Sequence, residues 1–151
     1  MFGRSESRRF GLWLGALALA FTAGCGNNAT NPTPVLSTDT LSGTLAAQGT
    51  STQVFTVNYA YGYSDAAVKV TSLKTVANAV DVNKTIGVGF GSINSFDGSC
   101  IRSSIYSTTT AQVNQVLTAS GQFSQGQYCV QIFDSGTLTE PTNYTVEIQH
   151  Y

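Results

Sequence analysis

The stretch of sequence that most restricts the fold is residues 126–135, which read G-Q-Y-C-V-Q-I-F-D-S. Tyr128, Val130 and Ile132 recur at every second position, and this is the period of side chains on one face of a β-strand. The stretch opens on glycine and runs into an Asp-Ser-Gly turn, and such residues bound strands. It therefore predicts a strand that buries one face in a core and turns Cys129 to the other face.

Short alternating segments of the same kind recur along the chain from residue 39 onward. They lie at residues 41–45, 53–59, 67–73, 85–91, 100–106, 113–118 and 144–148. Charged residues make up only 10 % of the chain, and the abundant neutral polar residues suit the exposed faces of sheets. Eight short strands predict an all-β fold, an antiparallel jelly-roll-like β-sandwich. Residues 111–117 also fit a helical turn, which leaves the sixth strand open to a second interpretation.

The alternation within these segments predicts which side chains leave the core. In the fifth segment it places Ile101 and Ile105 inward. The run I-G-V-G-F-G at residues 86–91 has an outer face of glycine alone, which a neighbouring aromatic such as Tyr106 would cover. His150 lies next to the C-terminus, where chain ends fray, so we expect it at the surface.

The first residues of the chain have the pattern of an export signal. Three arginines precede an apolar run at residues 11–21, which is too short for the roughly 20 residues of a membrane span. The run ends in T-A-G-C, and small residues before Cys25 resemble a bacterial lipobox, in which the cysteine is lipidated and the chain is cleaved before it. The alternative is an ordinary signal peptide cut nearby, with Cys25 left as a free thiol.

The residues after Cys25 have the composition of a tether. Residues 25–38 contain two prolines and no apolar periodicity, so we expect an extended segment between the lipid and the folded domain. The expected organisation is a signal peptide at residues 1–24, a lipidated tether at 25–38 and a β-sandwich domain at 39–151. In Gram-negative lipoproteins, which this pattern resembles, an Asp after the cysteine retains the protein at the inner membrane. Gly26 stands there instead, so we expect a lipid anchor in the outer membrane, facing the periplasm or the cell surface.

Two cysteines, Cys100 and Cys129, remain beyond the lipobox. Export to an oxidising compartment favours a disulfide between them. Both have the parity of outward positions on their strands, so the bridge would lie on an outer face and bring the two strands side by side or close to it. The alternatives, a redox-active pair or a metal site, need a second Cys or His nearby, and none follows either cysteine.

Composition argues against several classes of function. Beyond residue 25 there are seven acids and four bases, a difference of −3, and no basic cluster, so nucleic acid is not expected as a partner. The single histidine, His150, offers no base for a hydrolytic triad, and no cysteine–histidine cluster has the spacing of a zinc site. We therefore expect no enzymatic activity and no resident cofactor.

Tyr61 and Tyr63 are the candidate ligand-binding residues. They alternate with Tyr59 in N-Y-A-Y-G-Y, and a continuing strand would place all three rings in the core. Gly62 and the following Ser-Asp indicate a loop instead, and tyrosines on a loop can stack on sugar rings or hold a peptide. Both interpretations stay open for these residues.

Four runs of sequence together resemble the bacterial pre-peptidase C-terminal domain, a jelly-roll β-sandwich often appended to secreted peptidases. They are L-S-G-T-L at residues 41–45, V-F-T-V at 54–57, G-Q-Y-C-V-Q-I-F-D at 126–134 and N-Y-T-V-E-I at 143–148. Relatives that bind collagen use Ca²⁺, so the resemblance raises calcium as a cofactor. Here the acids stand singly, and Asp97 and Asp134 fit turn formers first.

The expected function is that of a non-catalytic cell-envelope lipoprotein. Its β-sandwich domain would serve binding or structural association, with a glycan or an envelope protein as candidate ligand and the membrane held through the N-terminal lipid. The alternative is an accessory domain that acts in trans with a separately encoded secreted peptidase.

Overall fold

The computed structural model describes residues 33–59 and 62–151, so Cys25, Tyr61 and the predicted signal peptide lie outside the described residues. Eight strands make up the described domain. They are β1 (Ser37–Leu45), β2 (Thr50–Val57), β3 (Ser64–Thr75), β4 (Ile86–Ile93), β5 (Cys100–Ala111), β6 (Val116–Phe123), β7 (Gly126–Phe133) and β8 (Thr142–His150). Within these ranges no helix is long and apolar enough to cross a membrane.

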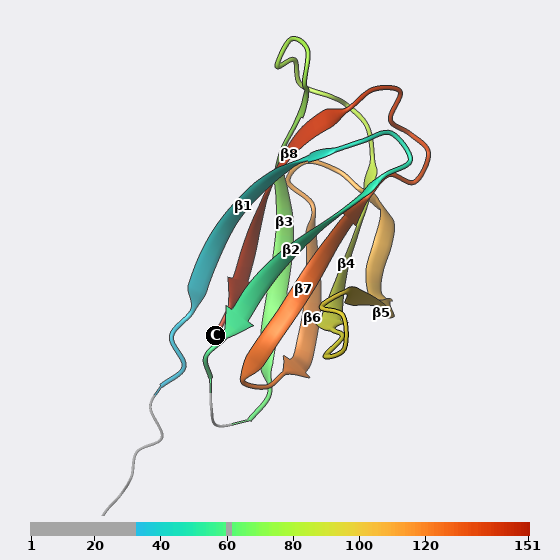
Figure 1. The fold of residues 1–151 in the computed structure, drawn as a ribbon. Helices are drawn as coiled ribbons and strands as arrows, with labels where there is room; N and C mark the ends of the chain where they lie inside the picture. The colour runs from blue at the N-terminus through green and yellow to red at the C-terminus, as the bar shows by residue number, and fades with distance from the viewer. Residues whose placement is uncertain (1–32, 60–61) are drawn as a thin grey trace, which may run out of the picture. The chain divides into compact units, whose positions relative to one another are not determined.

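The strands form two antiparallel four-stranded sheets, in the orders β1-β8-β3-β6 and β2-β7-β4-β5 (Figure 1). Strand β1 pairs with β8, β2 with β7, β3 with β6 and β4 with β5. These are the pairs of one long hairpin, and rolling that hairpin up adds the β8–β3 and β7–β4 contacts. This is the jelly-roll form of the β-sandwich, so the predicted fold class is confirmed.

The core lies between the sheets and consists of the inward residues of alternating strands. Five strands contribute buried side chains at every second position. They are Phe55 and Val57 of β2, Val68 and Val70 of β3, Ile86, Val88 and Phe90 of β4, Val130 and Ile132 of β7, and Val146 and Ile148 of β8. Each was predicted to be inward or has the parity of a predicted inward residue. The period-two pattern was sufficient for these residues because each group lies in a stretch of its strand without a change of face; in β3 the face changes only after Val70, where a bulge makes Leu73 the next buried residue.

Strand β5 departs from the prediction, because Ile105 is 80 % exposed and not inward, whereas Ile101 pairs with Ser92 on the inner side but is still 57 % exposed. Strand β5 is an edge strand, and its register with β4 shifts in the middle. Gly89 pairs with Ser107 and Gly91 with Arg102, so two positions on β4 correspond to five on β5, and three extra residues are inserted. A bulge of this kind reverses the face to which later residues point, so simple parity fails.

Strand ends also differ from the prediction. Residues 112–115 form a turn, with Asn114 at φ 71°, and β6 begins only at Val116. Strand β1 begins at Ser37, so it includes two residues that were assigned to the tether. His150 is 3 % exposed as the last residue of β8, where it pairs with Ser37 and Ala66 on either side, so its predicted surface position was wrong. Pairing on both sides prevents the expected fraying.

Strand directions divide the connections between the two ends of the sandwich. Because the sheets are antiparallel, the start of β1, the end of β8 and the β2–β3, β4–β5 and β6–β7 connections share one end. We call this the tether end, because the expected tether enters β1 there (Figure 1). The other four connections lie at the opposite end.

Candidate ligand-binding groove and the β4–β5 hairpin

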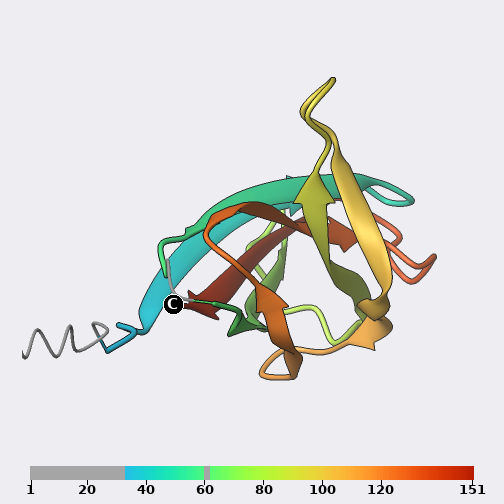
Figure 2. The same cartoon turned by 90° about the horizontal axis from the view of Figure 1, so that it is seen from below.

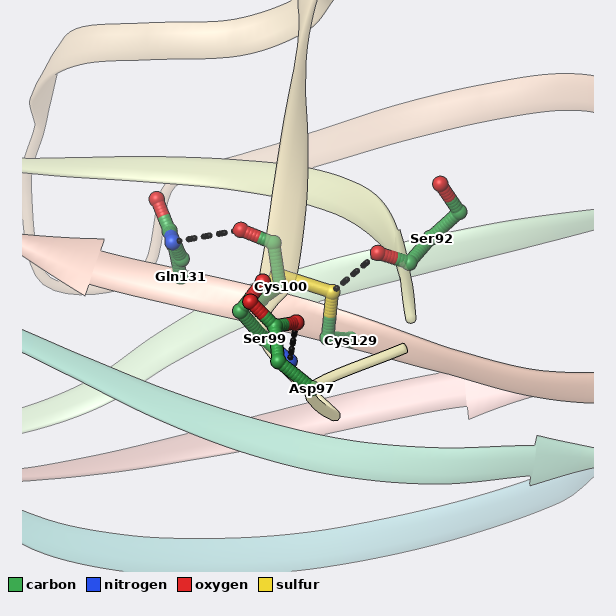
Figure 3. The surroundings of a disulfide bond; sticks show 6 residues. All are labelled: Ser92, Asp97, Ser99, Cys100, Cys129 and Gln131. Atoms are coloured by element: carbon green, nitrogen blue, oxygen red, sulfur yellow. Dashed lines mark hydrogen bonds between the residues drawn. A yellow bond between two sulfur atoms is a disulfide. The ribbon is translucent and has the colours of Figure 1, made fainter. Parts of the chain in front are cut away.

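The predicted disulfide between Cys100 and Cys129 is present, and its Cα atoms are 5.9 Å apart (Figure 3). It joins β5 to β7 although β4 lies between them in the sheet, so the bridge passes over β4. Cys129 lies on the outer face, as predicted, but it is 0 % exposed. The Gln131 side-chain amide donates a hydrogen bond to the Cys100 carbonyl at 3.0 Å, which adds a second link between the same strands.

The beginning of β5 can lie over β4 because Gly91 has no side chain. A Cβ atom on Gly91 would lie 2.5 Å from the Ile101 carbonyl oxygen and 3.0 Å from the Arg102 Cα. These are backbone atoms of β5, and no real Cβ contact is so short. The glycine therefore permits the close approach that the disulfide spans.

The other two glycines on this face are covered by side chains. A Cβ on Gly87 would meet the Phe133 ring, and one on Gly89 would meet the side chains of Ser107 and Arg102. The Arg102 guanidinium carbon lies 3.8 Å from the centroid of the Phe133 ring, a cation–π contact. Tyr106, the aromatic predicted to cover these glycines, packs against the core instead. The inserted residues of β5 turn it inward.

A groove of about 320 Å³ opens between the two sheets, beside this hairpin. It is lined by Phe90, Gly91, Ser92, Ile101, Arg102, Ser103, Tyr106, Gln122, Phe123 and Tyr128. The lining comes from β4, β5, β6 and β7, so the groove exists only where four strands meet.

The aromatic rings at the groove are held by one another. Phe90 and Phe123 meet edge to face at 5.3 Å, and Phe123 and Tyr128 at 4.8 Å. The Tyr128 hydroxyl accepts a hydrogen bond from the Ser124 backbone N–H at 3.2 Å. The lining has one charged residue, Arg102, whose guanidinium is stacked on Phe133. Phe90 and Phe123 are buried, so the partly exposed rings of Tyr106 and Tyr128 supply the accessible aromatic surface, with Ser and Gln at its border. Such a surface suits a neutral ligand with an apolar face, such as a sugar ring or a peptide side chain.

Tyr63, the described member of the predicted tyrosine pair, is 73 % exposed. It precedes Ser64, whose hydroxyl donates to the carbonyl of Phe123 at 3.1 Å. Phe123 lines the groove from β6, whereas Tyr63 stands just before the neighbouring strand β3, at the tether end. The structure does not bring Tyr63 into the groove lining, and Tyr61 lies outside the described residues.

The two acids considered for calcium are bound by backbone N–H groups. Both oxygens of Asp134 accept, from Gly136, Thr137 and Leu138 on one oxygen and from Gln48 on the other, at 2.8–3.1 Å. Burial opposes ionisation of this carboxylate, but the four N–H donors outweigh it and lower the pKa of Asp134. The Ser99 N–H similarly lowers the pKa of Asp97. Among the described residues no group of three or more His, Cys, Asp or Glu could hold a metal ion.

His150 and Asp39 form a second polar pair, at the edge between β8 and β1. The His150 Nε2 atom lies 3.0 Å from the Asp39 carboxylate, and the ring packs 5.3 Å from that of Phe55. The other ring nitrogen, Nδ1, is buried and has no hydrogen-bond partner. A triad needs a nucleophile on that nitrogen. The pair therefore has the orienting carboxylate of a triad without its reacting group.

A larger hollow of about 630 Å³ lies at the opposite end, around Lys74, Asp81 and Lys84. Lys74 and Asp81 pair there at 3.8 Å, and their side chains are 48 % and 89 % exposed. Water solvates both charges, so this hollow is less apolar than the aromatic groove.

Comparisons with known proteins place only the fold. No family model matches the sequence, and no curated protein matches it. A similar solved structure is the Yersinia pseudotuberculosis-derived mitogen, with a TM-score of 0.50 and 13 % identity over 78 % of this chain and 88 % of that one. A structure of Bacillus endospore appendages, described as disulfide-linked pili, has a TM-score of 0.36 and 10 % identity over 77 % of this chain and 86 % of that one. The first similarity supports the fold alone, and the second is too low to support the fold or a function.

Proposed function

We propose that this protein is a non-catalytic cell-envelope lipoprotein whose β-sandwich domain binds a neutral glycan or a protein segment in the groove between β4, β5, β6 and β7. The observation that carries the proposal is the set of ordered aromatic rings at an open groove of about 320 Å³. Phe90 and Phe123 are buried and hold the partly exposed Tyr128 ring in place, so that ring loses little conformational entropy on binding.

Anchoring in the outer membrane through lipid on Cys25 is the second part of the proposal. Its support is the T-A-G-C sequence after a short apolar run, and Gly26 in place of the inner-membrane Asp. The disulfide of the domain agrees with an oxidising compartment. We further propose that the domain is of the pre-peptidase C-terminal type, supported by the motif runs that form β7 and β8.

The absence of catalysis in this proposal is supported by the surroundings of the one histidine. His150 is buried, and its Nδ1 contacts no nucleophile. The groove lining includes no Asp, Glu or His; its titratable side chains are Arg102, Tyr106 and Tyr128.

Ligand screening with a groove variant tests the binding proposal. The protein with Cys25→Ser would be screened on a glycan array and by pull-down from envelope extracts, with and without Ca²⁺. We expect a ligand that is lost in Tyr106→Ala, which truncates a groove ring, and retained in Lys84→Ala at the opposite end. Loss in Tyr63→Ala alone would move the site to the β2–β3 loop. No ligand in either screen would contradict binding and leave a structural role.

A further inference from the structure

We propose that the tip of the β4–β5 hairpin contacts the membrane directly, with the Phe96 ring inserted among the lipids to which the chain is tethered. This inference rests on the lipid anchor of the proposed function. It adds a second contact and a fixed orientation of the domain, with the side from which the hairpin projects toward the bilayer.

Phe96 is an apolar side chain that the fold holds out in solvent. It is 98 % exposed, the largest exposed fraction among the large hydrophobic residues described. The turn that carries it is nevertheless well bonded. Asn94 and Ser99 close it through a 2.8 Å backbone bond, and the Asn94 side chain accepts from the Phe96 N–H at 3.0 Å. The backbone position of Phe96 is therefore set by a defined turn.

The base of the hairpin that carries this turn is held against the sheet. The Cys100–Cys129 disulfide and the close approach at Gly91 fix the beginning of β5 to the sheet. Figure 2, seen from the tether end, shows the β4–β5 hairpin standing out sideways from the body of the sandwich. Two further apolar side chains of β5, Ile101 and Ile105, are 57 % and 80 % exposed. The turn around Phe96 is otherwise polar, so the ring itself is the group that would enter the apolar phase, and a rigid arm makes that step cost little entropy.

The hairpin and the tether belong to the same end of the sandwich. Strand β1 begins there and β4 ends there, because the two run in opposite directions (Figure 1). Between Cys25 and the start of β1 at Ser37 lie 11 residues, which span at most about 40 Å when fully extended. Lipid on Cys25 would therefore keep this end within reach of the bilayer. Tyr63, a residue type favoured at membrane interfaces, lies on another connection at this end.

Charge indicates what kind of lipid surface fits. Asp39, Asp65 and Asp97 lie at the tether end, whereas Arg102 at the same end is stacked on Phe133. This balance gives no attraction to anionic headgroups. The contact is apolar, so zwitterionic phosphatidylcholine should support it. One ring binds too weakly to recruit a free protein, but a tether raises the local concentration enough for a weak contact to set orientation.

The fluorescence of one introduced tryptophan can test this contact without emission from native tryptophans. The only tryptophan of the chain is Trp13, so a protein processed at Cys25 has none. Full-chain protein would be expressed in bacteria, purified from membranes with its lipid, and reconstituted into phosphatidylcholine vesicles with or without bromine on the acyl chains. Phe96→Trp places the reporter on the tip. Val80→Trp is the matched control, since Val80 is 57 % exposed at the opposite end.

The expected result is that F96W shifts to the blue and loses most of its emission in brominated vesicles, while V80W is unchanged. Addition of anionic lipid should not alter this. Equal F96W emission in both kinds of vesicle, equal quenching of V80W, or a requirement for anionic lipid or for a membrane protein would overturn the proposal. Mass spectrometry of the same preparation separates the two failures. Acylated Cys25 with an unquenched tip refutes only the insertion, and a chain without acyl groups refutes the anchor on which it rests.

Discussion

Replacement of Gly91 by alanine should be the most damaging methyl addition on the outer face of β4. The added Cβ would lie 2.5 Å from the carbonyl oxygen of Ile101 and 2.9 Å from its carbonyl carbon. Strand β5 cannot withdraw freely, because the neighbouring Cys100 is bonded to Cys129. Overpacking costs 1–3 kcal/mol in general, so we expect about 3 kcal/mol at this site, or a midpoint lower by on the order of 10 °C.

Gly87→Ala is the matched comparison, because it adds the same methyl group to the same face of the same strand. Its Cβ would meet ring atoms of Phe133. That ring is only partly buried and can swing outward, with the loss of its contact to Arg102. A cation–π contact at an exposed site is worth about 0.5–1 kcal/mol, so we expect a cost of about 1 kcal/mol.

Urea unfolding of the two variants, in the wild-type background and with both cysteines changed to serine, measures these costs. The cost of Gly91→Ala should fall when the disulfide is removed, because β5 can then shift, whereas that of Gly87→Ala should not change. If Gly91→Ala costs no more than Gly87→Ala, or the same with and without the disulfide, β5 does not cross β4 as described.

Three further predictions concern the disulfide, the core and acid stability. Replacing Cys100 and Cys129 together by serine should lower the unfolding free energy by about 3 kcal/mol, since the bridge closes a loop of 29 residues; unchanged unfolding in urea would contradict this. Val130→Asp should abolish folding, seen as loss of the β-sheet circular dichroism, whereas Gln127→Asp on the exposed face should cost little; Gln131, which bonds the Cys100 carbonyl, is no neutral control. Asp134→Asn should be less stable than wild type at pH 7, and the gap should narrow below pH 3.8, because a lowered pKa contributes stability that is lost as protonation proceeds; a gap that is independent of pH in urea titrations would refute it.

Most of the fold could be predicted from the sequence because six of the strands keep their alternation throughout and β3 keeps it as far as Val70. Val130 and Ile132, or Val68 and Val70, are inward in both the prediction and the structure. Strand β5 could not be predicted in this way, because three inserted residues change its face between Arg102 and Ser107. No local pattern marks that insertion. The serines and threonines there satisfy the criteria for a strand with or without a bulge.

The candidate site was predictable only in part. The Cys100–Cys129 pairing followed from export and parity, since two cysteines have one partner each. The groove had no such signal, because Phe90, Tyr106, Phe123 and Tyr128 come from four strands, Tyr106 was expected on the outer face, and Phe123 lies outside the predicted strands. His150 was misjudged from its place in the chain, although Ser37 and Ala66 pair with it on both sides.

Mass spectrometry of the N-terminus tests most directly that this is a lipid-anchored envelope protein. The N-terminal peptide of the protein from the membrane fraction should begin at Cys25 and carry the added mass of acyl groups. The Cys25→Ser variant should leave the membrane fraction or keep residues 1–24. A wild-type chain that begins elsewhere without acyl groups, or a variant that partitions as the wild type does, would contradict the account.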